Sequence, residues 1–218
     1  MNTAQFHGVR ILIWDFDGTL TPPNAAFNSR IIEADYQVVM GHRGWTHEKT
    51  AAEFAKIYNV TTPSSTQTAA KLAGISVKEA AIECEQYKDR TAFLSADPHL
   101  QSLFTALSGY THYMLANGAR DKLIEALGVL GIPVSTFAEI VTAETVGVTK
   151  PDPKGFTYIM QKTGLSPEAH LMIGDREAVD LIPAKALGMH TCLVWSETNS
   201  TVADVTVPTV YDLEPLLV

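Results

Sequence analysis

The chain has 218 residues, of which 46% are hydrophobic and 18% are charged. This composition is typical of a folded globular protein and excludes a disordered chain; the length allows one large domain, or a core of about 130 to 150 residues with a smaller second domain. The formal net charge of −8 argues against a nucleic-acid partner, which normally requires a basic face.

Cysteine content and apolar run lengths narrow the class further. Cys84 and Cys192 are the only cysteines, and their wide separation predicts neither a disulfide framework nor a zinc site. Residues 1–10 contain no apolar stretch of signal-peptide length, and no run of about 18 apolar residues occurs. We therefore expect a soluble, cytoplasmic protein with no membrane partner.

The first predicted element is a buried strand over residues 9–14, an apolar run with β-branched residues. It leads directly into Asp15 and Asp17, which are followed by a Gly-Thr turn at Gly18 and Thr19. Two carboxylates this close can act around one divalent cation, because one can attack while the other handles the proton of a leaving group. An ordinary acidic turn is the alternative, since Asp and Gly are common turn residues.

The next stretch, residues 24–93, has no convincing strand and shows helical spacing over residues 50–58 and 77–93. Pro22-Pro23 leads into it and Asp97-Pro98 leads out of it, so residues that interrupt regular structure mark both crossings. We predict a helical cap over residues 22–94, inserted into a core of residues 1–21 and 95–218. The alternative is that these helices pack on the sheet within a single domain.

From about residue 95 onward, short apolar runs alternate with helical periodicity, which is the signature of a parallel sheet flanked by helices. The expected strands are residues 111–115, 140–143, 170–173, 191–195 and, more weakly, 204–207. The expected helices are residues 119–130, 156–163 and 177–187. Pro153 suits the start of the second helix, and Pro183 is expected to bend or shorten the third.

Chemically capable residues follow four of the predicted strands, where ligands of open parallel sheets bind. After the first strand come Asp15 and Asp17, and after the second comes Ala116-Asn117-Gly118. After the third comes Lys150 in a Lys-Pro-Asp-Pro sequence, and after the fourth come Asp175 and Asp180. The backbone N–H groups of Asn117 and Gly118 can hold a phosphate oxygen.

Together these four segments resemble the four motifs of the haloacid dehalogenase-like hydrolase superfamily, in order and in spacing, over nearly the whole chain. The segment between the first and second motifs resembles the helical cap of one large branch of that superfamily. The resemblance implies a Rossmann-like, three-layer α/β core with a parallel sheet and an inserted all-helical cap.

The resemblance also implies roles for individual residues. Asp15 would attack phosphorus to form an aspartyl-phosphate, and Asp17 would protonate the leaving oxygen and then deprotonate water. Mg²⁺ would be held by Asp15, the backbone carbonyl of Asp17 and Asp175, with Asp180 orienting a bound water or the lysine. Lys150 would neutralise the nucleophile and the oxygens of the transferring group.

The phosphate group is expected to lie against the Gly18-Thr19 turn and the Asn117-Gly118 turn. The superfamily has Ser or Thr where this chain has Ala116, and loss of that hydroxyl would weaken phosphate binding by roughly 1 kcal/mol. Backbone N–H groups, Thr19 or a water could compensate.

Each of these residues has a simpler interpretation when taken alone. Lys150 could be an exposed lysine before a helix, and Gly118 could serve only in a turn. Asp175 and Asp180 could be helix-start carboxylates stabilised by the helix dipole.

Residues 40–48 are expected to form a loop between cap helices. In capped relatives a loop in this position sets substrate specificity, so Arg43 is expected to grip an anionic group and Trp45 to stack on the substrate. The alternative is an ordinary turn in which Trp45 anchors the interior of the cap.

The predicted function is a Mg²⁺-dependent phosphatase that acts on a small phosphorylated metabolite. The combination of Asp17 with the Gly18-Thr19 turn argues against a dehalogenase. A phosphomutase on the same scaffold stays open, as does a catalytically weak phosphate-binding or regulatory protein that lacks the hydroxyl missing at Ala116.

Overall fold

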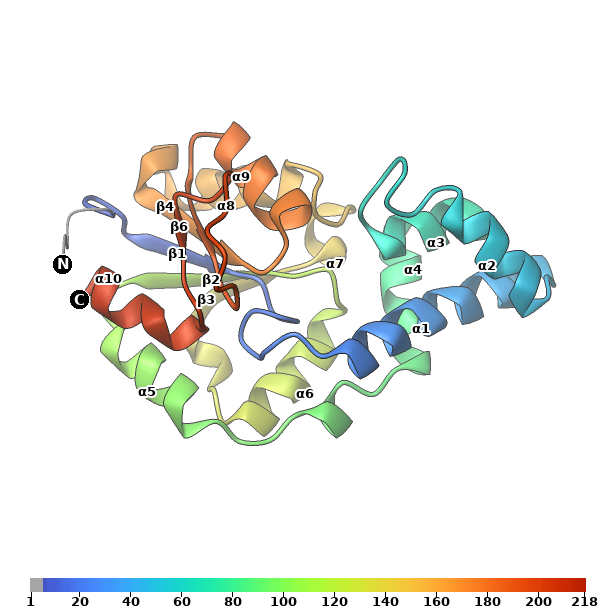
Figure 1. The fold of residues 1–218 in the computed structure, drawn as a ribbon, viewed down its shortest axis with the longest axis horizontal. Coiled ribbons are helices and arrows are strands. Elements are labelled where there is room, and N and C mark those ends of the chain that lie inside the picture. Colours follow the sequence, from blue (N-terminus) through green and yellow to red (C-terminus); the bar gives the residue numbers. More distant parts are fainter. Residues whose placement is uncertain (1–5) are drawn as a thin grey trace.

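The computed structural model describes residues 6–218, so the first five residues of the expected core segment 1–21 lie outside the described residues. Within that range a six-stranded sheet has the order β3-β2-β1-β4-β5-β6, and every neighbouring pair is parallel (Figure 1). The strands are β1 (Ile11–Trp14), β2 (Thr111–Leu115), β3 (Phe137–Val141), β4 (His170–Gly174), β5 (His190–Leu193) and β6 (Val205–Thr206).

The central strand β1 has both faces buried, as expected for an unbroken apolar run in a parallel sheet. Leu12 and Trp14 point into one hydrophobic cluster, and Ile11 and Ile13 point into a second cluster on the opposite face. The first cluster is covered by α5 (Pro98–Ala106) and α6 (Arg120–Leu130), the second by α8 (Lys154–Thr163) and α9 (Ile182–Ala186) (Figure 1). The predicted three-layer α/β class is confirmed.

Most predicted core elements occur, with shifted ends. The strand predicted over 111–115 is β2 without change, whereas β3 begins three residues earlier than expected. The strand predicted over 191–195 ends at Leu193, and Trp195 adopts a left-handed φ of 60° that interrupts an extended chain. The helix predicted over 177–187 is a π-helical turn (Glu177–Leu181) followed by α9, with Pro183 in the first turn of α9, where a missing N–H is tolerated.

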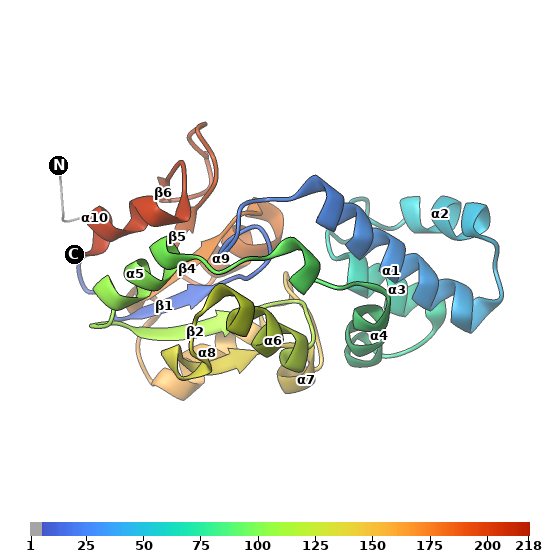
Figure 2. The same cartoon turned by 90° about the horizontal axis from the view of Figure 1, so that it is seen from below.

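Four helices form a separate group, called here the helical group: α1 (Ala25–Arg43), α2 (His47–Ala55), α3 (Ser65–Ala73) and α4 (Val77–Cys84). It lies beyond the carboxyl ends of the strands (Figure 2) and packs around its own hydrophobic cluster, formed by Ala34, Val38, Val39, Phe54, Ala69, Ala73 and Cys84. Each helix begins at a polar residue whose side chain accepts a backbone N–H, namely Asn24, Thr46, Ser64 and Ser76.

The helix predicted over 77–93 ends early, at Cys84. The chain continues through two 3₁₀ turns, Glu85–Tyr87 and Thr91–Phe93, within a return segment (residues 85–97) that leads back to the sheet. The remaining short helices are α7 (Ala143–Val146) and α10 (Glu214–Leu217), with 3₁₀ turns at Val134–Thr136, Pro167–Ala169 and Val210–Leu213. No helix within residues 6–218 is both long enough and apolar enough to cross a bilayer.

A buried histidine makes the stability of this fold depend on pH. The indole Nε1 of Trp14 donates to His112 Nδ1 at 3.0 Å, so His112 carries its proton on Nε2, which lies 3.1 Å from the Leu107 carbonyl. Burial lowers the pKa of His112 below its usual value. The unfolded chain therefore binds a proton that the folded chain does not, and stability falls as the pH drops below about 6.5.

We expect protonation of His112 to lower the free energy of unfolding by up to about 1.4 kcal/mol per pH unit in that range. Urea titrations at several pH values between about 7 and 5 should show a shallower dependence for His112→Gln than for the parent. The exposed His99 supplies the control variant His99→Gln, whose slope should match the parent. If the free energy of unfolding depends on pH equally in the parent and in His112→Gln, the assignment of this dependence to His112 is wrong.

Candidate active site

A buried lysine lies at the centre of the predicted site. Lys150 Nζ lies 2.8 Å from Asp15 Oδ1 and 2.6 Å from Asp180 Oδ1, and all three side chains are at most 5% exposed. Burial by itself lowers the pKa of Lys150, but the two carboxylates outweigh it, so the net pKa is raised and the ammonium stays charged. The alternative in which Lys150 is an exposed residue is therefore wrong.

Asn117 holds the backbone of Lys150 in place. Its amide Nδ2 donates to the Lys150 carbonyl at 3.1 Å, and its Oδ1 accepts the Lys150 N–H at 2.8 Å. This two-way contact joins the turn after β2 to the lysine segment. The side chain of Asn117 thus serves Lys150, while the residue itself remains at the wall of the cavity described below.

Three carboxylates converge beside this lysine. Asp15, Asp175 and Asp180 each offer an oxygen, and these oxygens lie within 4.8 Å of one another. Asp15 Oδ2 and Asp175 Oδ1 are buried without a hydrogen-bond partner among the described residues. Burial, followed by the neighbouring charges of Asp15 and Asp180, raises the pKa of Asp175 to about 7. Carboxylate oxygens are the ligands that Mg²⁺ prefers, and a cation would relieve this repulsion; the residues present fit that ion.

Two glycines make room for the carboxylates. A Cβ at Gly18 would collide with the Asp175 carboxylate, and a Cβ at Gly174 would lie 2.7 Å from Asp180 Cγ. Gly18 also has a φ of +79°, which other residues rarely adopt. Gly18 therefore contributes clearance for the Asp175 carboxylate.

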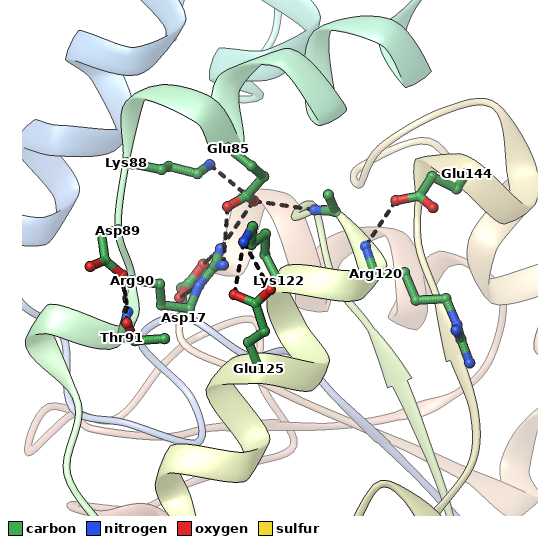
Figure 3. Close-up of polar contacts among 11 residues, drawn as sticks. Asp17, Glu85, Lys88, Asp89, Arg90, Thr91, Arg120, Lys122, Glu125 and Glu144 are labelled. Atoms are coloured by element: carbon green, nitrogen blue, oxygen red, sulfur yellow. Dashed lines mark hydrogen bonds and ion pairs between the residues drawn. The ribbon is translucent and has the colours of Figure 1, made fainter.

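The second carboxylate of the first motif points to a different partner. The guanidinium of Arg90 forms a two-point contact with Asp17, with Nε 2.8 Å from Oδ1 and Nη2 2.9 Å from Oδ2 (Figure 3). Burial raises the pKa of Asp17, but the charge and hydrogen bonds of Arg90 outweigh it, and the net pKa lies below the usual value. In this arrangement Asp17 is held as the carboxylate, so it must take up a proton before it can act as an acid. Arg90 was missed in the sequence, where it falls inside a predicted helix and has no distinguishing spacing.

A cavity of about 180 Å³ lies between the carboxyl edge of the sheet on one side and the helical group with the return segment on the other. The sheet side provides the predicted chemical residues Asp15, Asp17, Asn117, Gly118 and Asp175, together with Arg176. The opposite wall comes from the helical group and the segments that follow α2 and α4, and consists of Asn28, Ile31, Ile32, Tyr58, Ser65, Thr66, Lys88 and Arg90. Three remote segments of the core therefore meet at one small, polar space, and Lys150 lies behind them against Asp15.

Comparison with a family model decides the family. The model for haloacid dehalogenase-like hydrolases matches residues 9–188 of this chain. The chain belongs to the haloacid dehalogenase-like hydrolases. That match spans all four motif segments and confirms the resemblance predicted from the sequence.

Two archaeal proteins share part of the sequence. The glyceraldehyde 3-phosphate phosphatases of Methanothermobacter thermautotrophicus and Methanocaldococcus jannaschii are each 34% identical to this chain, over 96 and 104 residues. The alignments cover 44% and 47% of this chain and 42% and 45% of those proteins, so the chain matches less than half the length of these curated relatives.

Solved structures share the fold over almost the whole chain. A phosphatase of this family from Thermococcus onnurineus gives a TM-score of 0.65 at 21% identity, covering 96% of this chain and 98% of that one. A 2-haloacid dehalogenase from Pseudomonas syringae gives a TM-score of 0.60 at 18% identity, with coverages of 96% and 98%. Because proteins named for different reactions share this fold, the fold alone does not select the reaction.

Two residues of the family motifs lie away from the cavity. Thr19 was expected to bind phosphate, but its side chain is fully buried and does not line the cavity; its carbonyl accepts the indole N–H of Trp195 at 2.9 Å. Ala116, at the position where this family has a hydroxyl, is buried in the hydrophobic cluster between the sheet and α6. Of the two turns expected to hold phosphate, Asn117 and Gly118 line the cavity, whereas Gly18 and Thr19 do not.

The structure contradicts the predicted substrate contacts of Arg43 and Trp45. Arg43 is the last residue of α1, eleven residues beyond Ile32 at the cavity wall, or roughly 17 Å at 1.5 Å per helical residue. Its Nε donates to the Leu72 carbonyl near the end of α3. Trp45 packs against the hydrophobic cluster of the helical group, as the alternative reading expected. Of the predicted 40–48 loop, residues 40–43 are the end of α1, residues 47–48 are the start of α2, and only residues 44–46 form the connection.

Metal binding at the three carboxylates should stabilise the fold. At a Mg²⁺ concentration about 100 times Kd, the expected gain is about 2.7 kcal/mol, or roughly 5–10 °C in Tm for a chain of this size. Asp175→Asn should lose most of this shift, while Asp121→Asn, at an exposed position on α6, should keep it. Melting curves with Mg²⁺ and with EDTA measure the effect, and an unchanged shift in Asp175→Asn would count against the site.

Proposed function

We propose that this protein is a Mg²⁺-dependent phosphatase that hydrolyses the phosphate monoester of a small metabolite. The observation that carries the proposal is the buried ammonium of Lys150 held between Asp15 and Asp180. Beside it, Asp15 and Asp175 each have a buried oxygen with no hydrogen-bond partner within residues 6–218. This arrangement offers a nucleophile, a fixed cation and a set of metal ligands at one sheet edge.

In the proposed reaction Asp15 attacks phosphorus, and the bond between phosphorus and the leaving oxygen breaks to give an aspartyl-phosphate and an alcohol. Asp17 gives a proton to that oxygen, then takes a proton from the water that releases phosphate and restores Asp15. Lys150 balances the charge of Asp15 and of the equatorial oxygens. Mg²⁺, held by Asp15, the Asp17 carbonyl and Asp175, with Asp180 nearby, would supply further charge stabilisation.

We further assign residues 22–94 as a cap and residues 1–21 and 95–218 as the core. The helical group has its own hydrophobic cluster and forms one wall of the cavity. It meets the core next to the catalytic lysine, where Ser64 Oγ lies 3.0 Å from Thr149 Oγ1 and Gln67 Nε2 donates to the Thr149 carbonyl at 3.1 Å. A cap in this position covers the side of the cavity opposite the sheet edge.

The cavity favours a small substrate. Its volume of about 180 Å³ is below the range of about 300–1,000 Å³ usual for drug-sized ligands. The names of the archaeal relatives point to glyceraldehyde 3-phosphate, and a three-carbon phosphate suits this space better than a nucleoside monophosphate. Phosphoglycolate and small sugar phosphates are the next candidates.

The test is phosphate release from a panel of these esters, with Mg²⁺ and with EDTA. We expect turnover that requires the metal and is fastest for two- and three-carbon esters. After a single turnover in ¹⁸O-water, mass spectrometry should find the label in the released phosphate, because water attacks phosphorus. For the same reason Asp15 should stay unlabelled even after repeated turnover. Label in Asp15 would mean attack at its carbonyl carbon and would contradict this route.

The panel also separates the two alternatives. A phosphomutase would move the phosphate within the substrate and release little of it. A regulatory phosphate-binding protein, the reading that Ala116 keeps open, would turn over none of the esters. Both outcomes would replace the phosphatase assignment.

A further inference from the structure

A chain of three charged side chains runs from the return segment to the catalytic turn of the core (Figure 3). Glu85 contacts Arg90, and Arg90 contacts Asp17. The side chains of Arg90 and Glu85 are only 2% and 4% exposed, whereas that of Asp17 is 27% exposed at the cavity. The two buried members therefore hold the one that is exposed at the cavity.

Glu85 fixes the far side of the guanidinium. Its two oxygens lie 3.3 Å from Nη1 and 3.4 Å from Nη2 of Arg90, and Oε1 also accepts the backbone N–H of Ala119 at 3.2 Å. Ala119 is the N-cap residue of α6 and directly follows the Asn117-Gly118 turn. Lys88 Nζ, 3.4 Å from the same oxygen, adds a second cation to the carboxylate.

Two aromatic rings and a glycine also pack against the guanidinium of Arg90. Its guanidinium carbon lies 5.6 Å from the ring centre of Phe16 and 5.5 Å from that of Phe27. A Cβ at Gly118 would lie only 3.0 Å from Arg90 Nη2. The planar guanidinium is thus held by contacts on its faces and along its far edge, and the remaining edge is presented to Asp17.

A two-point contact with a fixed guanidinium sets the orientation of a carboxylate as well as its distance. Lys88 and Arg176 also act on Asp17 through their charge, but among the described residues only Arg90 makes hydrogen bonds to it. A lysine in place of Arg90 would keep the charge and lose the two-point geometry.

We propose that Arg90, held by Glu85, is a positioning residue that aims the Asp17 carboxyl at the leaving oxygen of the substrate. The inference rests on the proposed function, in which Asp17 transfers the proton to that oxygen. Arg90 and Glu85 belong to the return segment, so this segment contributes to proton transfer as well as to the cavity wall.

The experiment compares two esters that have nearly the same shape and differ in the acidity of the leaving group. Phenyl phosphate releases phenol, with a pKa of about 10, and needs a proton; p-nitrophenyl phosphate releases a much stronger acid and needs it far less. General acid catalysis contributes about 10²- to 10⁴-fold. We expect Arg90→Lys and Arg90→Gln to lower kcat/KM for phenyl phosphate at least about tenfold more than for p-nitrophenyl phosphate.

Two control variants interpret the result. Lys122→Ala breaks a nearby exposed ion pair with Glu125 and should leave the ratio of the two kcat/KM values at the parental level. Asp17→Asn should change this ratio more than either Arg90 variant. If Asp17→Asn leaves both rates intact, the proposed function itself fails.

If Asp17→Asn changes the ratio and both Arg90 variants leave it unchanged, only the positioning role is overturned. Partial unfolding lowers both rates by the same factor, so it cannot imitate the expected change. A loss shared equally by the two esters would likewise mean that Arg90 has a structural role or binds the phosphate, and it would overturn the inference.

Discussion

Asp15→Asn is expected to lower kcat/KM by at least about 10³-fold for every ester that the protein hydrolyses, which is the scale seen when a catalytic nucleophile is removed. An amide cannot attack phosphorus as a carboxylate does, yet it has almost the same shape. Lys150 would keep its 2.6 Å contact with Asp180, so the substituted chain should still fold. Steady-state phosphate release measures the loss, and circular dichroism checks the fold.

The matched control for this substitution is Asp121→Asn, which makes the same chemical change at an exposed position in the first turn of α6. It should keep parental kinetics. Retention of more than about a tenth of the activity by folded Asp15→Asn would mean that another group attacks the ester, and the proposed assignment of the nucleophile would be wrong.

Lys150→Met is expected to have the largest effect on stability. The ammonium is buried between Asp15 and Asp180, and methionine would fill much of its volume while leaving both carboxylates without their cation. Breaking a buried ion pair by removing one partner typically costs about 3–5 kcal/mol. We expect a loss of that size in the free energy of unfolding, measured by urea denaturation in EDTA, together with loss of turnover.

Lys122→Met is the corresponding surface control. Its ammonium forms an exposed pair with Glu125, and such pairs contribute little to stability because solvent screens them. Equal destabilisation by the two substitutions would show that the site does not depend on the charge of Lys150, and the electrostatic account of the centre would have to be abandoned.

Much of the candidate site could be predicted from the sequence, because the strands and their parallel direction follow from local patterns, whereas the order of the strands in the sheet was seen only in the structure. The apolar runs before Asp15 and Asp175 identify buried parallel strands, and the carboxyl ends of such strands share one edge. Residues that follow those runs must therefore lie near one another. The structure brings Asp15, Asp175 and Asp180 within 4.8 Å for this reason, with Lys150 beside them.

The helical group and the return segment were harder to predict from the sequence. Its helices were anticipated, but the periodicity over 77–93 continues past Cys84, where the helix ends. Glu85 and Arg90 leave the helical pattern to reach Ala119 and Asp17 in the core. No local spacing contains that information, because the partners lie 34 and 73 residues away in the chain. Arg43 and Trp45 were misassigned for a related reason: α1 continues through Arg43, and Trp45, although in a loop, packs against the hydrophobic cluster of the helical group.

The sequence by itself thus determined the α/β class, the family and the edge at which the acidic residues and the lysine meet, since hydrophobic periodicity and motif order specify these. Only the tertiary structure decided that Lys150 is buried, that Asp17 is held by Arg90, and that the cavity wall comes from α1, the start of α3 and the return segment. Burial and ion pairing depend on which distant side chains share a volume, and that is established only when the helices have packed against the sheet.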